Sequence, residues 1–180
     1  MILQQTLAFV DIETTGLEYG KGEIIELGVV IAKFKDDTLT VIGELDLKIA
    51  PKHIETADPV ALRVNGYNEA DWLFAVSLEE AMKTFVDKTA GSVFVAHNLL
   101  FDYGFIESSL KETGVENTLY FQKIDTLSLA FGILQNNDDI GKLSLRALCD
   151  KYGIENKKAH SAFADAYATY EVFKKLLNLK

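Results

Sequence analysis

The sequence contains little of what several classes of protein require. Cys149 is its single cysteine, which excludes an intrachain disulfide and a multi-cysteine zinc site and favours a reducing compartment such as the cytoplasm. Only 2 residues are proline, and 48% are hydrophobic, so the chain is neither disordered nor collagen-like. No apolar run approaches the roughly 18 residues of a membrane-spanning helix, and no signal peptide precedes residue 7. We therefore expect a cytoplasmic protein without a membrane partner, folded as one domain over residues 1–180.

Positive charge is also scarce. The formal net charge of −9 argues against a protein that coats a nucleic-acid backbone with lysine and arginine. The two ends differ, because residues 1–90 carry 8 basic and 16 acidic side chains whereas residues 140–180 carry 8 basic and 4 acidic ones. The C-terminal segment could therefore face a polyanion, or its lysines could be a solvated surface: Lys157, Lys158, Lys174 and Lys175.

Hydrophobic periodicity predicts an α/β fold. Three strands are expected first, at residues 7–12, 24–32 and 40–49, followed by an irregular stretch after Pro51 and Pro59. A capping box at Ser77 and Glu80 then predicts the start of a helix. Two further strands are expected to alternate with helices: strands at 92–96 and 119–125, helices at 101–113, 126–134, 143–152 and 162–179. This order predicts a mixed sheet with helices packed on its faces.

Two acidic residues follow the first apolar run. Side chains at positions i and i+2 of a strand project from the same face, so Asp11 and Glu13 are expected to lie side by side. Either one could simply end the strand and cap a turn. As a pair they repel each other, which weakens the purely structural interpretation.

Two more acidic residues fall on apolar faces of predicted helices. Asp102 shares a face with Phe105 and Ile106, although an Asp near a helix start can also be a cap. Asp165 lies on the expected buried stripe of the last helix, among small alanines that permit close packing. Unbalanced buried ions cost several kcal/mol each. Two divalent cations with oxygen ligands, Mg²⁺ or Mn²⁺, would offset the four charges and would suit phosphodiester displacement.

His160 precedes Asp165 by five residues, which on a helix would place the two about 140° apart. We therefore expect His160 in the loop before the helix, with Ser161 near the N-cap. A histidine with an ordinary pKa near 6.5 can serve as the general base for an attacking water. A purely structural role is the alternative.

Three segments resemble a known family: FVDIETTGL at 9–17, VAHNLLFDYGFI at 95–106 and HSAFAD at 160–165. They are similar to the three exonuclease motifs of the DEDDh 3′-to-5′ exonucleases, the superfamily that includes the proofreading epsilon subunit of bacterial DNA polymerase III. Their order and spacing match, and the resemblance covers nearly the whole chain. It implies a ribonuclease-H-like fold, with a mixed five-stranded sheet flanked by helices.

The resemblance also implies roles for individual residues. The ligands of the two cations would be Asp11, Glu13, Asp102 and Asp165, with His160 as the general base. Thr14, Thr15 and Leu17 lie where the family holds the terminal nucleotide. The segment IDTLSLA at 124–130 is similar to a structural family segment, in which Asp125 would accept hydrogen bonds rather than bind metal.

Some positions depart from the family pattern. Asn65 stands where relatives often have a histidine beside a glycine, so it is expected to contact the nucleotide differently. Phe131 follows the DTL segment where an arginine is frequent. His97 and Asn98 match; we expect Asn98 to contact substrate and His97 to be structural. No tail follows Lys180, which argues against a dedicated epsilon subunit, while a DNA polymerase subunit remains a candidate partner.

The sequence therefore predicts a metal-dependent exonuclease that releases nucleoside 5′-monophosphates from single-stranded 3′ ends, with DNA favoured. One alternative is an exonuclease with the same reaction whose substrate is RNA or short oligoribonucleotides. Another is a module that binds 3′ ends or a protein partner without cleaving. Such a module should have lost at least one of the five predicted site residues, and all five are present.

Overall fold

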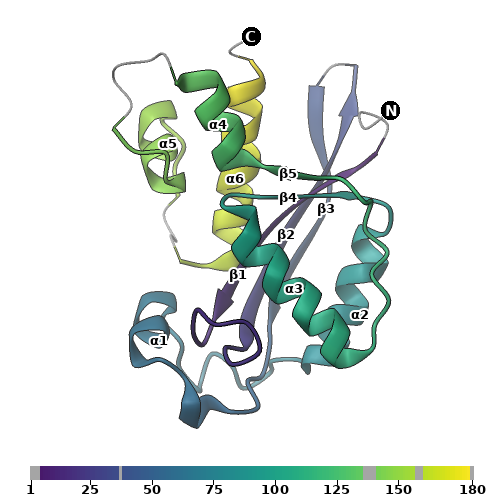
Figure 1. Ribbon diagram of the computed structural model, residues 1–180, viewed down its shortest axis with the longest axis vertical. Helices are drawn as coiled ribbons and strands as arrows, with labels where there is room; N and C mark the ends of the chain where they lie inside the picture. The colour runs from purple at the N-terminus through teal and green to yellow at the C-terminus, as the bar shows by residue number, and fades with distance from the viewer. Residues whose placement is uncertain (1–4, 37, 136–140, 157–159, 179–180) are drawn as a thin grey trace.

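The computed structural model describes residues 5–36, 38–135, 141–156 and 160–178 (Figure 1). Its five strands form one sheet in the order β3-β2-β1-β4-β5. The strands are β1 (Leu7–Thr14), β2 (Ile24–Lys35), β3 (Thr38–Lys48), β4 (Val93–Ala96) and β5 (Lys123–Asp125). β1, β2 and β3 pair antiparallel, while β4 runs parallel to both β1 and β5. The predicted mixed five-stranded sheet is confirmed.

The helices flank this sheet (Figure 1). They are the short 3₁₀ helix η2 (Ile54–Thr56), α1 (Pro59–Asn65), α2 (Leu78–Thr89), α3 (Leu99–Thr113), α4 (Thr126–Leu134), α5 (Leu145–Tyr152) and α6 (Ala162–Leu177). The predicted cap at Ser77 is confirmed, because its side chain accepts a hydrogen bond from the backbone N–H of Glu80. In the described part of the chain, every helix is too short or too polar to span a bilayer.

The structure differs from the prediction at four places. The stretch after Pro59 is not irregular, since α1 forms there with Asp58 as its N-cap and Gly66, at φ 69°, as its C-cap. This helix buries a single residue, Asn65, so it has no apolar stripe for periodicity to detect. The last strand begins at Lys123 rather than residue 119, and α3 and α5 each begin two residues away from their predicted starts.

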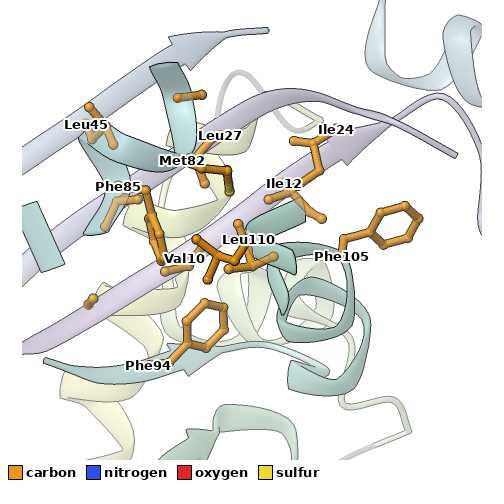
Figure 2. Packing of buried hydrophobic residues seen from close by; sticks show 14 of the residues in the cluster. Val10, Ile12, Ile24, Leu27, Leu45, Met82, Phe85, Phe94, Phe105 and Leu110 are labelled. Atoms are coloured by element: carbon orange, nitrogen blue, oxygen red, sulfur yellow. The ribbon is translucent and has the colours of Figure 1, made fainter. Parts of the chain in front are cut away.

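β1 separates two hydrophobic clusters. Ala8, Val10 and Ile12 belong to the cluster beneath α2 and α3, in which Phe85, Phe94 and Leu110 are also buried (Figure 2). Leu7 and Phe9 point to the opposite face, where the Phe9 ring lies edge-on to Tyr170 and Phe173 of α6 at centroid distances of 5.4 and 5.3 Å. Because strand side chains alternate, Asp11 and Glu13 continue the α6 face.

A glycine in β2 lets α6 approach the sheet closely. A Cβ atom on Gly28 would lie 2.2 Å from the carbonyl carbon of Ala162, a distance that no side chain can occupy. Gly28 pairs with Asp11 in the sheet. The first turn of α6 therefore rests on β2 directly beside the acidic end of β1.

Candidate active site

The acidic end of β1 lies in an unusual electrostatic environment. The pKa of Glu13 is raised to about 8, chiefly by burial and then by the charges of Asp165, Glu26 and Asp102. The pKa of Asp11 is well above its ordinary value, first because of burial and then because of the same neighbouring carboxylates. The predicted pairing of these two acids on one face is therefore present, and their charges are unfavourable together.

Asp102 reaches the same place from α3. Its side chain is 4% exposed, and its Oδ1 accepts a hydrogen bond from the backbone N–H of Ile12 at 3.2 Å. Its pKa is raised to about 7, because burial and the charge of Asp165 together outweigh the lowering effect of the N–H of Ile12. The prediction that this Asp faces inward is confirmed, and the hydrogen bond ties it to β1.

Asp165 lies in the first turn of α6 and is half-buried. Its Oδ2 accepts the backbone N–H of His160 at 3.0 Å, and its Oδ1 accepts a hydrogen bond from the Asn156 amide. His160 is exposed, precedes the helix and adopts a left-handed conformation with φ 69°. Its predicted position in the loop is therefore confirmed. Ligand atoms of Glu13, His160 and Asp165 lie within 4.8 Å of one another.

Together the four acids form what we call the carboxylate cluster: Asp11, Glu13, Asp102 and Asp165. It offers only oxygen ligands, and burial together with neighbouring carboxylates raises the pKa values of Asp11, Glu13 and Asp102, so their charged forms are unfavourable there. Hard divalent cations such as Mg²⁺ and Mn²⁺ prefer this donor set, and their charge would relieve the excess. The residues present therefore fit the predicted pair of cations.

Sequence reasoning missed a fifth acid, Glu26. This side chain is 7% exposed on β2, where it pairs with Glu13 across the sheet. Burial raises its pKa, while the N–H of Ala162 and the charge of Lys48 lower it. The sequence does show an acidic residue inside the apolar run IIELGVV at 24–30. Only the pairing of β1 with β2 shows that this residue borders the carboxylate cluster.

A pocket of about 280 Å³ adjoins the cluster. Its lining includes Glu13, Thr14, Leu17, Val64, Asn65 and Phe101. Leu17 is 75% exposed, so its side chain is available to a ligand. Thr14 and Thr15 are buried, and their hydroxyls bond within the loop, Thr14 to the carbonyl of Gly16 and Thr15 to the N–H of Glu23.

Asn65 and Asn98 differ in what their side chains contact. The buried Asn65 amide donates to the carbonyl of Thr14 at 3.0 Å and accepts the N–H of Tyr67. Asn65 therefore holds the loop that carries Thr14. Asn98 is exposed at the start of α3 with φ 67°; its backbone N–H binds Asp125, and its side chain does not cap the helix. Asn98 is not among the residues that line the pocket.

The two residues predicted to be structural have structural contacts. Asp125 accepts hydrogen bonds from the first residues of both α3 and α4, including Leu99 and Ser128. His97 lies between the Thr126 hydroxyl at 3.0 Å and the Leu143 carbonyl at 2.9 Å. Burial lowers its pKa, which keeps it neutral. Lys157 and Lys158, two candidates for a polyanion contact, lie outside the described residues.

Comparisons with known proteins agree with this architecture. An exonuclease family model, RNase_T, matches residues 8–173. The chain is 34% identical over 169 residues to a PolC-type DNA polymerase III of Caldanaerobacter subterraneus subsp. tengcongensis, a match that covers 93% of this chain but only 11% of that protein. It is 30% identical over 186 residues to ribonuclease T of Shewanella frigidimarina, with 94% of this chain and 80% of that protein covered.

Solved structures share the fold. E. coli exonuclease I in complex with a dT13 oligonucleotide has a TM-score of 0.80 at 20% identity, over 96% of this chain and 41% of that one. The nuclease domain of 3′hExo, a DEDDh family member bound to rAMP, has a TM-score of 0.76 at 15% identity, over 97% and 92%. The predicted ribonuclease-H-like fold is confirmed. Because the family model matches most of its length, the chain belongs to the RNase_T exonuclease family.

Proposed function

We propose that residues 1–180 form a single exonuclease domain that hydrolyses the last phosphodiester bond at single-stranded 3′ ends and releases nucleoside 5′-monophosphates. One observation carries this proposal: acids from β1, α3 and α6 meet in the carboxylate cluster, with His160 beside it. Family membership supports the reaction class. The geometry supports the role of each residue.

The carboxylate cluster would hold two divalent cations, Mg²⁺ or Mn²⁺. When bound, these ions would stabilise the charge that develops on the phosphate and the leaving oxygen. The protein supplies fixed oxygen atoms from three elements, two of them already oriented by hydrogen bonds: Asp102 by the N–H of Ile12, and Asp165 by the N–H of His160. This preorganisation lets the site bind cations without rebuilding the fold.

His160 is the proposed general base. It binds Asp165 through its backbone N–H, which leaves the imidazole to accept a proton from the attacking water. Its position before α6, on the exposed side of the cluster, lets it approach the water from solvent. The loop position beside Glu13 and Asp165 therefore supports a proton-transfer role for His160.

The pocket next to Glu13 is the proposed site of the terminal nucleotide. Its apolar wall, which includes Leu17, Val64 and Phe101, suits one face of a base. Main-chain groups of Thr14 and Thr15 would meet the 3′ end, with Asn65 acting indirectly by holding Thr14. Asn98 stays a predicted contact for the adjoining nucleotide. In this arrangement the enzyme binds the end of a strand and few of its other phosphates.

DNA is the favoured substrate, and two relatives support it: the PolC-type DNA polymerase III and the exonuclease I structure with a dT13 oligonucleotide. The former also makes a DNA polymerase subunit the protein partner to test. RNA is the second candidate, because the chain covers most of ribonuclease T and shares its fold with an rAMP-bound nuclease.

A substrate panel tests the proposal. Single-stranded DNA, duplex DNA, RNA and a dinucleotide, each labelled at the 5′ end, are digested with Mg²⁺ or Mn²⁺ and with a chelator. We expect ladders that shorten from the 3′ end, fastest on single-stranded DNA, and no products with the chelator. The Asp11→Asn protein is the matched control for contaminating nuclease. Faster cleavage of RNA than of DNA would make RNA the favoured substrate. Inactivity on all four substrates would contradict the proposal.

A further inference from the structure

Helix α6 begins without a cap of its own. Ser161 occupies the N-cap position, yet its side chain makes no capping hydrogen bond. The N–H of Ala162 instead donates to Oε2 of Glu26, at 3.2 Å, from the neighbouring strand β2. The first N–H groups of a helix have no partner within the helix, and a carboxylate there also interacts favourably with the helix dipole. A sheet residue therefore performs the function of the cap.

The ammonium group of Lys48 contacts the other oxygen of the Glu26 carboxylate. Lys48 pairs with Glu26 in the β2–β3 register, and its Nζ lies 3.7 Å from Oε1 of Glu26. The same ammonium lies 3.7 Å from the centroid of the Trp72 ring. Trp72 is itself fixed, because its indole N–H donates to the carbonyl of Ile25 at 3.0 Å. Both oxygens of Glu26 thus have a partner, and the carboxylate has one orientation.

The turn that Glu26 holds carries half of the active site. Asp165 lies in the first turn of α6, and His160 lies two residues before the helix. Glu13, which must meet both, is the β1 neighbour of Glu26. The second contact of this turn with the sheet is the close packing of Ala162 on Gly28, two residues along the same strand. Gly28 allows α6 to pack closely on β2, and Glu26 binds the N-terminal end of α6.

We propose that Glu26, oriented by Lys48, is a positioning residue that sets the place of His160 and Asp165 relative to Glu13. The inference rests on the proposed function and extends it to a residue outside the carboxylate cluster. It differs from a simple stability role, since a misplacement of about 1 Å at a reacting centre can cost 100-fold in rate. It also differs from a charge effect, because the hydrogen-bond acceptor rather than the negative charge is what α6 needs.

Two substitutions of Glu26 separate these roles. Glu26→Gln keeps an oxygen that can accept the N–H of Ala162 and removes the charge. Glu26→Ala removes both. We expect Glu26→Ala to lower kcat by about 10- to 100-fold with KM within about threefold, and Glu26→Gln to retain kcat within about threefold of wild type. Lys48→Met, which keeps an apolar stem beside Trp72, should fall between them.

Two controls match the substitutions. Ser144→Ala removes the side chain that caps α5, so it costs a helix cap on a helix other than α6. Glu44→Gln removes one negative charge from the exposed face of β3. Both should leave kcat within about threefold of wild type when assayed well below their melting temperatures. A loss of kcat in Ser144→Ala equal to that in Glu26→Ala would show a general stability effect and overturn the proposal.

A measurement that needs no activity completes the test. Amide hydrogen exchange at Ala162 and Phe163 should be faster in metal-free Glu26→Ala than in wild type or Glu26→Gln, with the core strands unchanged. If the wild type proves inactive on nucleic acids, the proposed function fails while this exchange pattern still reports the positioning contact. Unchanged exchange in Glu26→Ala, or equal kcat losses in Gln and Ala, would overturn the inference.

Discussion

The two faces of β1 differ at the end where the strand leaves the sheet. Toward α2 and α3, the residues stay apolar as far as Ile12 and complete the cluster in Figure 2. Toward α6, the apolar Leu7 and Phe9 give way to Asp11 and Glu13, whose charges are unfavourable where they lie. Both faces of the strand thus contribute to the core, and we expect the chemistry only at the acidic end of the α6 face. Substitutions at Phe9 and Asp11, only two residues apart, should therefore differ: the first should lower stability, and the second should lower turnover.

The largest expected effect concerns the carboxylate cluster. Asp11→Asn, Glu13→Gln, Asp102→Asn and Asp165→Asn should each lower turnover by at least about 10³-fold, because each removes a charged oxygen that the cations require. Single-turnover cleavage of a labelled strand measures this loss. A variant within tenfold of wild type, roughly 1.4 kcal/mol, would remove that residue from the site.

Replacement of His160 should have the next largest effect. His160→Gln and His160→Asn should lower turnover by about 10² to 10⁴-fold while metal binding stays nearly intact, since a general base is lost and no ligand is. Asn tolerates the left-handed conformation at this position, so it separates loss of the base from backbone strain. Equal single-turnover rates between pH 6 and 9 in wild type and both variants would contradict the assignment.

On the same strand, Phe9 should show the opposite behaviour. Its ring is fully buried against Tyr170 and Phe173, so Phe9→Ala should lower the free energy of unfolding by about 3–5 kcal/mol. Below its melting temperature the folded fraction should keep wild-type turnover and metal dependence. Urea unfolding and an activity assay on the same sample measure both. A selective loss of turnover would show that the apolar and acidic parts of the α6 face are not independent.

The smallest expected effect is on pH. Glu13 and Asp102 have folded-state pKa values of about 8 and about 7, above their unfolded values of 4.5 and 3.8. Between these limits the native state holds more protons than the unfolded state, so stability should fall as pH rises from about 4 to about 8. Melting of the metal-free protein should show this fall, Glu13→Gln should flatten it, and Mg²⁺ should reverse it. Stability that rises over this range without metal would contradict the assigned shifts.

Much of the fold could be predicted from the sequence, because β1 and β2 are long apolar runs and α2 has both a cap and an apolar stripe. α1 could not, since only Asn65 of its seven residues is buried. Its start and stop signals, Asp58 with Pro59 and Gly66, were present without the periodicity that identifies a helix.

The site was predictable where an acid stood on an apolar face, as Asp102 does beside Phe105 and Ile106. Glu26 was not, because its role depends on strand register and on a helix that begins 136 residues later in the sequence. The hydrogen bonds of Asn65 also depend on tertiary structure, since they join α1 to the end of β1. Contacts between distant segments leave no local pattern in the sequence.

We expect the acids that destabilise the metal-free fold to be the ones that carry the reaction. Glu13→Gln tests it most directly, with melting temperature and single-turnover rate measured on one preparation at pH 8. We expect a higher melting temperature than wild type without metal, a smaller rise on adding Mn²⁺, and turnover lower by at least about 10³-fold. A lower metal-free melting temperature, or retained turnover, would contradict it.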